Sequence, residues 1–501
     1  MGFTTLDYGI VLAYLVLVAA VGILSGGRQQ STTDYFLGRR NIPWVAVCLA
    51  IVATETSTLT FISIPGLAYA TNLNFLQVTF GYLIGRIIIS VILLPAYAKG
   101  ELSTAYQLLG NRFGPTMQRT TSIAFMVTRI LADGVRLFAT AIPLALLLAG
   151  WQQFSDVPPE QIYVVAILIL AAITITYTYV GGVRAVIWTD VVQLFMYIGG
   201  AIGSIIVILS ALPEGAVLFP PEKMSVFNPG IGLSFRDFFG TAYTLPAGLL
   251  GGAFLSMASH GTDHIIVQRL LTVRTLRGSQ KALIWSGVIV IFQFALFLLL
   301  GILLFSFYRE FAGVTSIDGL GLAKADELFP KFIIEQIPSG LSGLIVAGLL
   351  AAAMSTLSGS VNSLASATIN DLYIPNSRRF RVNELTLSRI VSLFWCLLLV
   401  GVAIFFISYH TGFLVELALS IASVTYGALL GVFMLGVLTT AARERDAMIG
   451  FGAGLLLMIG FFLFGELAWT WYTLVGSVTA FAVGWMSALV NRPAVPPGGR
   501  S

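Results

Sequence analysis

The sequence predicts an all-α polytopic membrane protein of about 13 transmembrane helices, ten of which form two inverted five-helix repeats. Three observations lead to this fold class. Of the 501 residues, 57% are hydrophobic and 10% are charged, whereas soluble domains average about 25% charged residues. Apolar stretches near the roughly 20 residues that a spanning helix needs recur along the chain. Polar clusters interrupt two of these stretches at matching positions.

This composition excludes a soluble enzyme, and no segment has the alternating pattern of a transmembrane β-barrel. The sequence contains neither a P-loop nor a G-x-S-x-G motif, so we expect neither ATP coupling nor covalent catalysis and no organic cofactor. The net charge of +4 does not indicate nucleic-acid binding. The expected partners are a small-molecule substrate, an ion and the lipid bilayer, and we expect the chain to function as a monomer.

Thirteen hydrophobic segments can be marked off, at residues 7–25, 43–70, 74–98, 118–149, 161–180, 187–211, 238–267, 282–307, 339–372, 386–408, 411–440, 447–465 and 468–490. If the N-terminus lies outside, 19 of the 27 Lys and Arg residues fall inside and five fall outside. The positive-inside rule therefore predicts an external N-terminus and a cytoplasmic C-terminus in the cell membrane.

The expected organisation follows from these segments. An extra N-terminal helix and a cytoplasmic loop occupy residues 1–42, and two C-terminal helices with a cytoplasmic tail occupy residues 441–501. Between them we expect a first five-helix repeat at 43–211, an external loop at 212–237 and an inverted second repeat at 238–440.

Polar clusters interrupt the second and the seventh segments. Residues 54–58 read TETST, and residues 259–264 read SHGTDH. An acid in a span costs about 2.5–3.5 kcal/mol on insertion scales, so it usually faces a cavity or a partner. An interval of five segments makes the two broken helices cross in opposite directions, as in inverted repeats that hold substrate and ion at their broken helices. The alternative is a pair of polar kinks in a channel or scaffold.

The ninth segment carries a face of small polar residues. Ala352, Ser355 and Thr356 share one side of a helix by their i+3 and i+4 spacing. Hydroxyl and carbonyl oxygens suit a hard cation such as Na⁺. The alternative is that these small residues only allow close packing between membrane helices.

Five short motifs resemble the sodium:solute symporter family, and the resemblance runs through essentially the whole chain. They are DYFLGR at 34–39, IPG at 64–66, GGVRAVIWTD at 181–190, VQR at 267–269 and DLY at 371–373. The resemblance implies a leucine-transporter-type fold and secondary active, sodium-coupled symport of a small polar solute (an amino acid, organic acid or sugar) into the cell by alternating access. Two alternatives remain: a proton-coupled or facilitative transporter on this fold, and a membrane sensor that does not transport.

Motif by motif, the resemblance implies one sodium site. Its ligands would be the carbonyls of Ala53, Thr56 and Ala352 and the hydroxyls of Ser355 and Thr356. Some members bind a second ion, which would lie here at Asp190 and Ser358. A glycine, Gly359, stands where a serine is common.

Candidate substrate contacts gather near the two breaks, namely Glu55, Ser57, Thr58, Gln77, Arg136 and Asp263. Glu55 could complete a cation shell, carry a coupling proton, bind a substrate ammonium or pair with a buried arginine. Arg129, Asp133 and Arg136 share a helix face. They could form an ion network with Glu55 or Asp263, or one arginine could clamp a substrate carboxylate.

Overall fold

The computed structural model describes residues 4–26, 30–99, 102–149, 154, 156–322, 324–373, 383–408 and 414–490. Within these residues all regular structure is helical, and ten helices are long and apolar enough to cross a membrane. The all-α multi-pass fold class is therefore confirmed. The arginines at 28, 378, 379 and 381 and the tail at 491–501, which contribute to the predicted topology, lie outside the described residues.

The first half of the chain forms a first helix, a broken helix and four further long crossings. In order, the helices are α1 (Thr5–Gly26), α2 (Thr32–Leu37), α3 (Trp44–Glu55), α4 (Thr58–Ala70), α5 (Leu76–Ile92), α6 (Leu94–Ala98), α7 (Tyr106–Phe113), α8 (Pro115–Ala149) and α9 (Pro159–Ala211).

The second half repeats the pattern of a broken helix followed by long ones. Its helices are α10 (Phe235–Gly240), a π-helical turn (Ala247–Gly251), α11 (Gly252–Gly261), α12 (His264–Leu271), α13 (Leu276–Ala312), α14 (Leu328–Gln336), α15 (Leu341–Ala367) with a π-helical end (Thr368–Tyr373), α16 (Glu384–Phe406), α17 (Leu414–Leu438), α18 (Glu444–Phe464) and α19 (Trp469–Val490).

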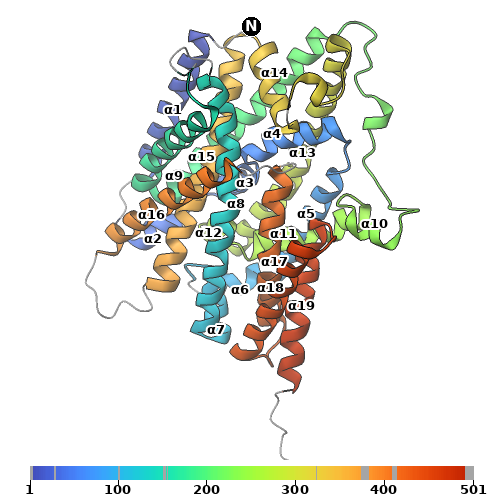
Figure 1. Ribbon diagram of the computed structural model, residues 1–501. Coiled ribbons are helices and arrows are strands. Elements are labelled where there is room, and N and C mark those ends of the chain that lie inside the picture. Colours follow the sequence, from blue (N-terminus) through green and yellow to red (C-terminus); the bar gives the residue numbers. More distant parts are fainter. Residues whose placement is uncertain are drawn as a thin grey trace, which may run out of the picture.

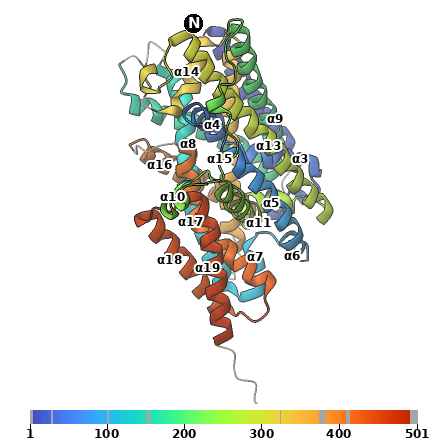
Figure 2. The ribbon, with the colours of Figure 1, turned by 90° about the vertical axis from the view of Figure 1, so that its right-hand side faces the viewer.

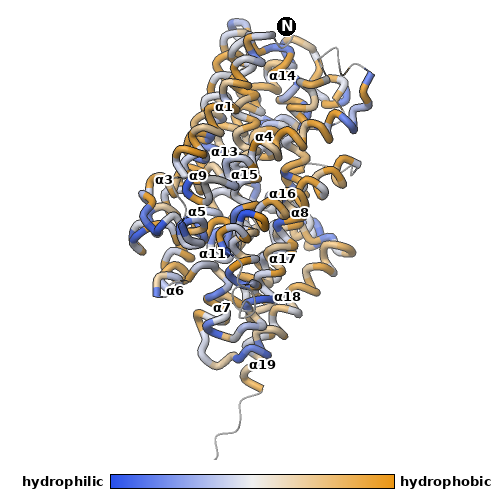
Figure 3. Tube along the Cα trace, turned by 90° about the vertical axis from the view of Figure 1, so that its left-hand side faces the viewer, coloured by the Kyte–Doolittle hydropathy of each residue, from blue (hydrophilic) through white to orange (hydrophobic). Residues whose placement is uncertain are grey.

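The long helices run roughly side by side, and the two ends of the assembly carry different segments. The N-terminus and α14 lie at one end, whereas α7 and the end of α19 lie at the other (Figures 1 and 2). Apolar residues cover the outer helices, and hydrophilic residues gather near the middle around α5 and α11 and at the end that carries α7 (Figure 3). Helix α15 is buried over nearly its whole length, so its hydroxyl groups face protein.

Among the described residues, each of the thirteen predicted segments contains helix, with one difference in how they connect. The fifth and sixth segments have no loop between them, because α9 continues through both and changes direction at Gly182, whose φ is +59°. Only glycine adopts this conformation readily. A Cβ atom there would also lie 2.5 Å from the carbonyl oxygen of Tyr35. The expected loops further contain the short helices α7, α10 and α14.

Both predicted breaks are confirmed. Helix α3 ends at Glu55 and α4 begins at Thr58, while α11 ends at Gly261 and α12 begins at His264. Short polar side chains favour such breaks because they offer the backbone alternative hydrogen bonds. At the second break, Asp263 is the N-cap of α12 and accepts a bond from the backbone N–H of Ile265 at 2.9 Å.

Helices α5 and α11 approach each other backbone to backbone. A Cβ atom at Gly85 would lie 2.3 Å from the carbonyl oxygen of Ala253, and one at Gly252 would lie 2.4 Å from that of Val78. Small residues at membrane helix interfaces allow this separation. Any side chain larger than hydrogen at either glycine would push the two helices apart.

Helix α1 is fastened to the beginning of α15 by a single carboxylate. Asp7 is fully buried and accepts hydrogen bonds from the backbone N–H groups of Gly340 (2.7 Å) and Gly343 (2.8 Å) and from the Ser342 hydroxyl (2.6 Å). A carboxylate is favourable at this position because the first turn of a helix has unpaired N–H groups and a partial positive charge.

Candidate functional site

The break between α3 and α4 releases two backbone carbonyl groups. The N–H of Ser57 donates to the carbonyl of Glu55 (3.0 Å), and the N–H of Thr60 donates to that of Ser57 (2.9 Å). In a continuous helix these donors would serve Ala53 and Thr56. The carbonyl oxygens of Ala53 and Thr56 therefore lose their helical partners in a buried environment, where a cation can take the place of the missing donors.

The hydroxyl groups of α15 could supply further cation ligands beside these carbonyl groups. Ser355 donates to Asp190 Oδ1 at 2.6 Å, and Thr356 donates to the carbonyl of Ala352 at 3.2 Å. Both side chains are buried. Because each proton is directed to an acceptor, the hydroxyl lone pairs remain available to a cation. This set of neutral oxygens fits Na⁺ by its chemistry.

The two sets of oxygens lie on elements that contact each other. At the start of α4, the Thr58 hydroxyl donates to the carbonyl of Leu349 on α15 (3.4 Å). Helix α3 also packs against α15 and against α9, which carries Asp190, the carboxylate that binds Ser355. The five residues predicted to bind sodium therefore lie on two neighbouring helices at the first break.

The predicted second-ion residues have protein partners. Asp190 is fully buried, and its Oδ2 accepts a bond from Arg269 Nη2 at 3.0 Å. Ser358 donates to the carbonyl of Ser355 at 3.1 Å. A Cβ atom at Gly359 would lie 2.8 Å from Arg269 Nη2, so the guanidinium occupies the space beside Asp190 that a side chain at 359 would need.

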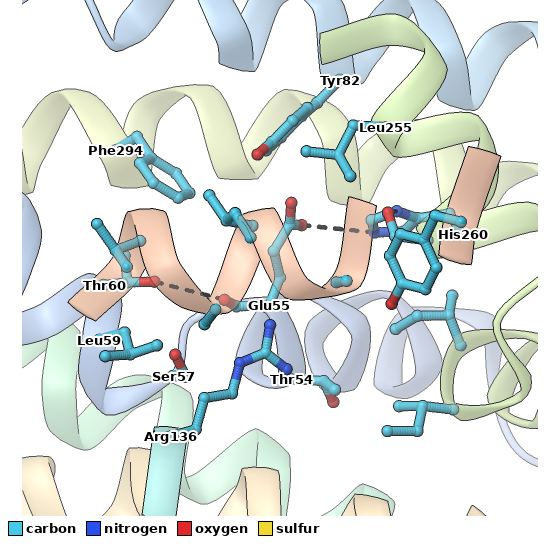
Figure 4. Close-up of a pocket in the computed structure, with 18 of the residues that line it drawn as sticks. Thr54, Glu55, Ser57, Leu59, Thr60, Tyr82, Arg136, Leu255, His260 and Phe294 are labelled. Carbon is cyan, nitrogen blue, oxygen red and sulfur yellow. Dashed lines mark hydrogen bonds and ion pairs between the residues drawn. The ribbon is translucent and has the colours of Figure 1, made fainter. Parts of the chain in front are cut away.

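A pocket lies between the two broken helices. It is lined by residues of α3, α4, α5, α8, α11, α12, α13 and α17, including Glu55 and His260 from near the two breaks. In the close-up of Figure 4, Arg136, Thr54 and Ser57 lie on one side of Glu55, and Phe294, Tyr82 and Leu255 lie on the other. The side opposite Arg136 thus presents the apolar side chains of Phe294 and Leu255 and the ring of Tyr82, together with the Tyr82 hydroxyl and the Glu55 carboxylate.

The structure separates the predicted substrate residues into two groups. Glu55, Ser57 and Arg136 line the pocket. The other three do not line it and have protein partners: the Thr58 hydroxyl accepts a bond from Thr140 (2.9 Å), the Gln77 amide group bonds to the backbone of Asn74, Asn228 and Tyr243, and Asp263 caps α12.

Glu55 pairs with a buried arginine, one of the alternatives that the sequence leaves open. Arg86 on α5 donates to Glu55 Oε2 and, at 2.7 Å, to the Ser286 hydroxyl. His260 Nε2 lies 3.6 Å from the same carboxylate oxygen. Glu55 therefore faces the pocket with its charge already balanced by Arg86.

A second ion network joins α8 to the second break and to α17. Arg129 donates to Asp263 through Nε (2.9 Å) and to Asp133 (3.2 Å), and Tyr426 donates to Asp263 at 2.6 Å. Arg136 Nη1 donates to Asp133 at 2.8 Å. Asp263 thus belongs to the expected ion network. Arg136 Nε is buried without a hydrogen-bond partner among the described residues.

The sequence placed Arg86 within a span without assigning its partner, and it did not identify several residues that line the pocket. Arg86 orients Glu55, and Tyr82, Phe294 and Leu255 form much of the apolar wall. One signal was available for two of them: Tyr82 and Arg86 are four residues apart in an otherwise apolar segment, so they share a helix face.

Comparison with known proteins identifies the family. The model of the sodium:solute symporter family matches residues 35–454. The chain belongs to the sodium:solute symporter family. This membership confirms the predicted function class, a transporter that couples small organic solutes to Na⁺ and not an enzyme.

Individual members of the sodium:solute symporter family match over most of the chain. The sodium/sialic acid symporter NanT of Aliivibrio fischeri is 28% identical, covering 97% of this chain and 93% of NanT. The mouse sodium-coupled monocarboxylate transporter 1 is 28% identical, covering 91% of this chain and 73% of the transporter. The structure of a substrate-bound, outward-open, sodium-coupled sialic acid symporter superposes with a TM-score of 0.83 at 24% identity, covering 98% of this chain and 99% of that one, and has the same fold.

Proposed function

We propose that this chain takes up a small monocarboxylate with one Na⁺ ion, and that Arg136 binds the carboxylate in the pocket between the two broken helices. The unpartnered Nε atom of Arg136 carries this proposal. An arginine presents two parallel N–H donors to a carboxylate. Because Nη1 is held by Asp133, the side chain is oriented before substrate arrives.

The charges around the pocket support a substrate with one negative charge. Three positive and three negative side chains lie in or beside the pocket, and each has a partner of opposite charge. They are Arg86, Arg129, Arg136, Glu55, Asp133 and Asp263. Sodium would add one positive charge to this balanced set. Unpaired charge is costly at membrane depth, so a monoanion would stabilise bound sodium and sodium would stabilise the bound monoanion. A named relative, the monocarboxylate transporter, carries such solutes.

Sodium would bind at Ala53, Thr56, Ala352, Ser355 and Thr356. This site joins the break after α3 to α15, and it adjoins the pocket through Glu55, Thr54 and Ser57. We assign one sodium rather than two because Arg269 supplies the positive charge beside Asp190. Movement of the repeat at 43–211 against the repeat at 238–440 would then expose the sites to either side in turn.

We also propose that the chain acts as a monomer with an external N-terminus. The positive-inside count supports this orientation. The arrangement of the ends agrees with it, since the N-terminus and α14, which falls in a predicted external loop, lie together and opposite α7 (Figure 1). Labelling of single cysteines at Ser316 and Asn111 from either side of sealed vesicles tests the orientation.

Uptake by the purified full chain in proteoliposomes tests the function. A panel of labelled carboxylates, amines and sugars is offered under an inward sodium gradient, with a potassium gradient and a proton gradient as separate arms. We expect sodium-driven accumulation of a monocarboxylate. Arg136→Gln should raise its half-saturating concentration about tenfold to a hundredfold, the scale of a hydrogen bond to a charged group.

Two features of the chain make this test specific. In Arg136→Gln, Asp133 keeps a cationic partner because Arg129 also binds it, so the substitution does not strand a buried charge. Arg236→Gln is the matched control, since Arg236 is exposed and pairs with Glu466 away from the pocket. Accumulation of a neutral sugar or an amine, or carboxylate uptake that Arg136→Gln leaves unchanged, would overturn the proposal.

A further inference from the structure

We infer that the carboxylate this pocket accepts has a compact apolar body, aliphatic or aromatic, and few or no hydroxyl groups. The inference rests on the proposed function and names the part of the substrate that Arg136 does not contact. It comes from the composition of the wall opposite Arg136 and from the hydrogen-bonding capacity that the pocket has left.

The wall opposite Arg136 is apolar and preformed. Phe294, Leu255 and Tyr82 are each at most 5% exposed, although they line the pocket. Phe75 stacks on Phe294 with ring centroids 5.3 Å apart and planes 13° apart, which fixes both rings. Rigid aromatic and aliphatic walls bind apolar groups without having to order first.

Three hydroxyl groups of the pocket are committed to protein partners, whereas the hydroxyls of Ser57 and Tyr82 make no hydrogen bond to the described residues. Thr54 donates to the carbonyl of Ala50 (2.7 Å), Thr60 donates to that of Glu55 (3.4 Å), and the Ser259 hydroxyl lies 2.8 Å from His260 Nδ1. No Asn or Gln is among the described residues that line it. A polyhydroxylated acid would carry more hydroxyl groups than the hydroxyls of Ser57 and Tyr82 can pair, and each buried hydroxyl without a partner carries a desolvation penalty.

The pocket also has no spare anion for an ammonium group. Glu55 is the acidic side chain that lines it among the described residues, and Arg86 already binds Glu55. An α-amino acid would place its ammonium in a pocket that contains Arg136 and Arg129. The arrangement therefore favours a simple carboxylate over a zwitterion of the same size.

The test is competition with the sodium-driven uptake of the labelled monocarboxylate that proteoliposomes accumulate in the uptake panel. The competitors are 4-methylpentanoate and phenylacetate, the zwitterion leucine, and the hydroxylated acids gluconate and N-acetylneuraminate. We expect the two apolar carboxylates to inhibit at concentrations at least about tenfold lower than the other three, as pockets reject groups that they cannot pair.

One variant of a wall residue and one control variant complete the experiment. Leu255→Asn places an amide in the apolar wall and should narrow that preference to less than about threefold. Leu250→Asn is the matched control, because Leu250 precedes α11 by two residues and is 50% exposed, and it should leave the preference unchanged. Thermal unfolding of each variant verifies that the fold is retained.

The outcomes separate this inference from the proposed function. If gluconate or N-acetylneuraminate competes as well as the apolar acids, and uptake still depends on sodium and Arg136, the apolar body is wrong and the carboxylate symporter stands. If leucine competes best, the inferred apolar carboxylate is likewise wrong and the sodium-coupled carboxylate symporter stands. If none of the carboxylates competes, both are overturned. If Leu255→Asn leaves a tenfold preference intact, the assignment of the wall is wrong.

Discussion

The hydroxyl of Ser355 donates a hydrogen bond to Asp190 Oδ1 over 2.6 Å, while the other carboxylate oxygen of Asp190 accepts one from Arg269. This relationship fixes the direction of the Ser355 proton and leaves the lone pairs of the hydroxyl oxygen available to a cation. A single buried carboxylate therefore orients a proposed sodium ligand and holds a guanidinium in place.

Removing one hydroxyl from the proposed sodium site should weaken sodium binding. For Ser355→Ala and for Thr356→Ala we expect sodium to bind about 1–3 kcal/mol more weakly, the scale of one polar contact at a buried site. The measurement is the sodium dependence of solute uptake. Ser363→Ala is the control, because Ser363 lies on the same helix and donates to the carbonyl of Ser360. Unchanged sodium affinity in both variants would remove these residues from the site.

A side chain at position 359 should displace Arg269 from Asp190. In Gly359→Ser the new Cβ would lie 2.8 Å from Arg269 Nη2, so the guanidinium must move and the buried pair weakens. We expect a lower thermal unfolding midpoint in detergent, because an uncompensated buried charge is strongly destabilising. In Gly452→Ser, no atom outside the helix lies within 4 Å of the new Cβ, so this control should be neutral or slightly stabilising. A midpoint for Gly359→Ser equal to that of the control would contradict the assignment.

The stability of the protein should fall more when one partner of the Glu55–Arg86 pair is removed than when both are removed. Glu55→Gln leaves Arg86 buried with an uncompensated charge, and removing one member of a buried pair costs about 3–5 kcal/mol. The double variant Glu55→Gln with Arg86→Met should recover most of this stability. Chemical denaturation and sodium-driven uptake are measured on the same preparations. Full transport and unchanged ion coupling in Glu55→Gln would leave Glu55 with a structural role alone.

Loss of the Asp7 carboxylate should detach α1 from α15. In Asp7→Ala, the N–H groups of Gly340 and Gly343 and the hydroxyl of Ser342 lose their acceptor. We expect a destabilisation of about 2–4 kcal/mol, because buried donors without partners carry a desolvation penalty. Ser342→Ala, which removes one of the donors and leaves the carboxylate, should cost less. Limited proteolysis between α1 and α2 reports the detachment, and equal resistance in wild type and Asp7→Ala would refute it.

The sequence could predict the helical class and both breaks because their causes are local. The cluster at 54–58 and the cluster at 259–264 each place hydroxyl and carboxylate residues inside an apolar stretch, and the second cluster adds a glycine. Such residues interrupt a helix through bonds to their own backbone. The change of direction in α9 at Gly182 could not be predicted from the local sequence, because Gly182 lies against Tyr35, almost 150 residues earlier in the chain.

Pairings between distant helices could not be predicted in the same way. Glu55 and Asp263 both sit at breaks, and each resembled a substrate contact. Glu55 does line the pocket, but its partner is Arg86 on another helix, and Asp263 is held by Arg129 and Tyr426 behind the pocket. Tertiary packing determines which charged side chains face the cavity and which pair with one another. The spacing of residues along one helix carries no information on this packing.

The backbone contact between α5 and α11 determines which parts of the molecule can shift relative to each other. With glycine on both sides, the carbonyl groups of one helix rest in the surface of the other, and sliding by even one residue would drive a side chain into that contact. These two helices come from opposite halves of the chain. They are therefore expected to resist sliding along this contact. Movement of one repeat against the other would then turn about this contact, and the pocket would open at interfaces where bulkier side chains meet.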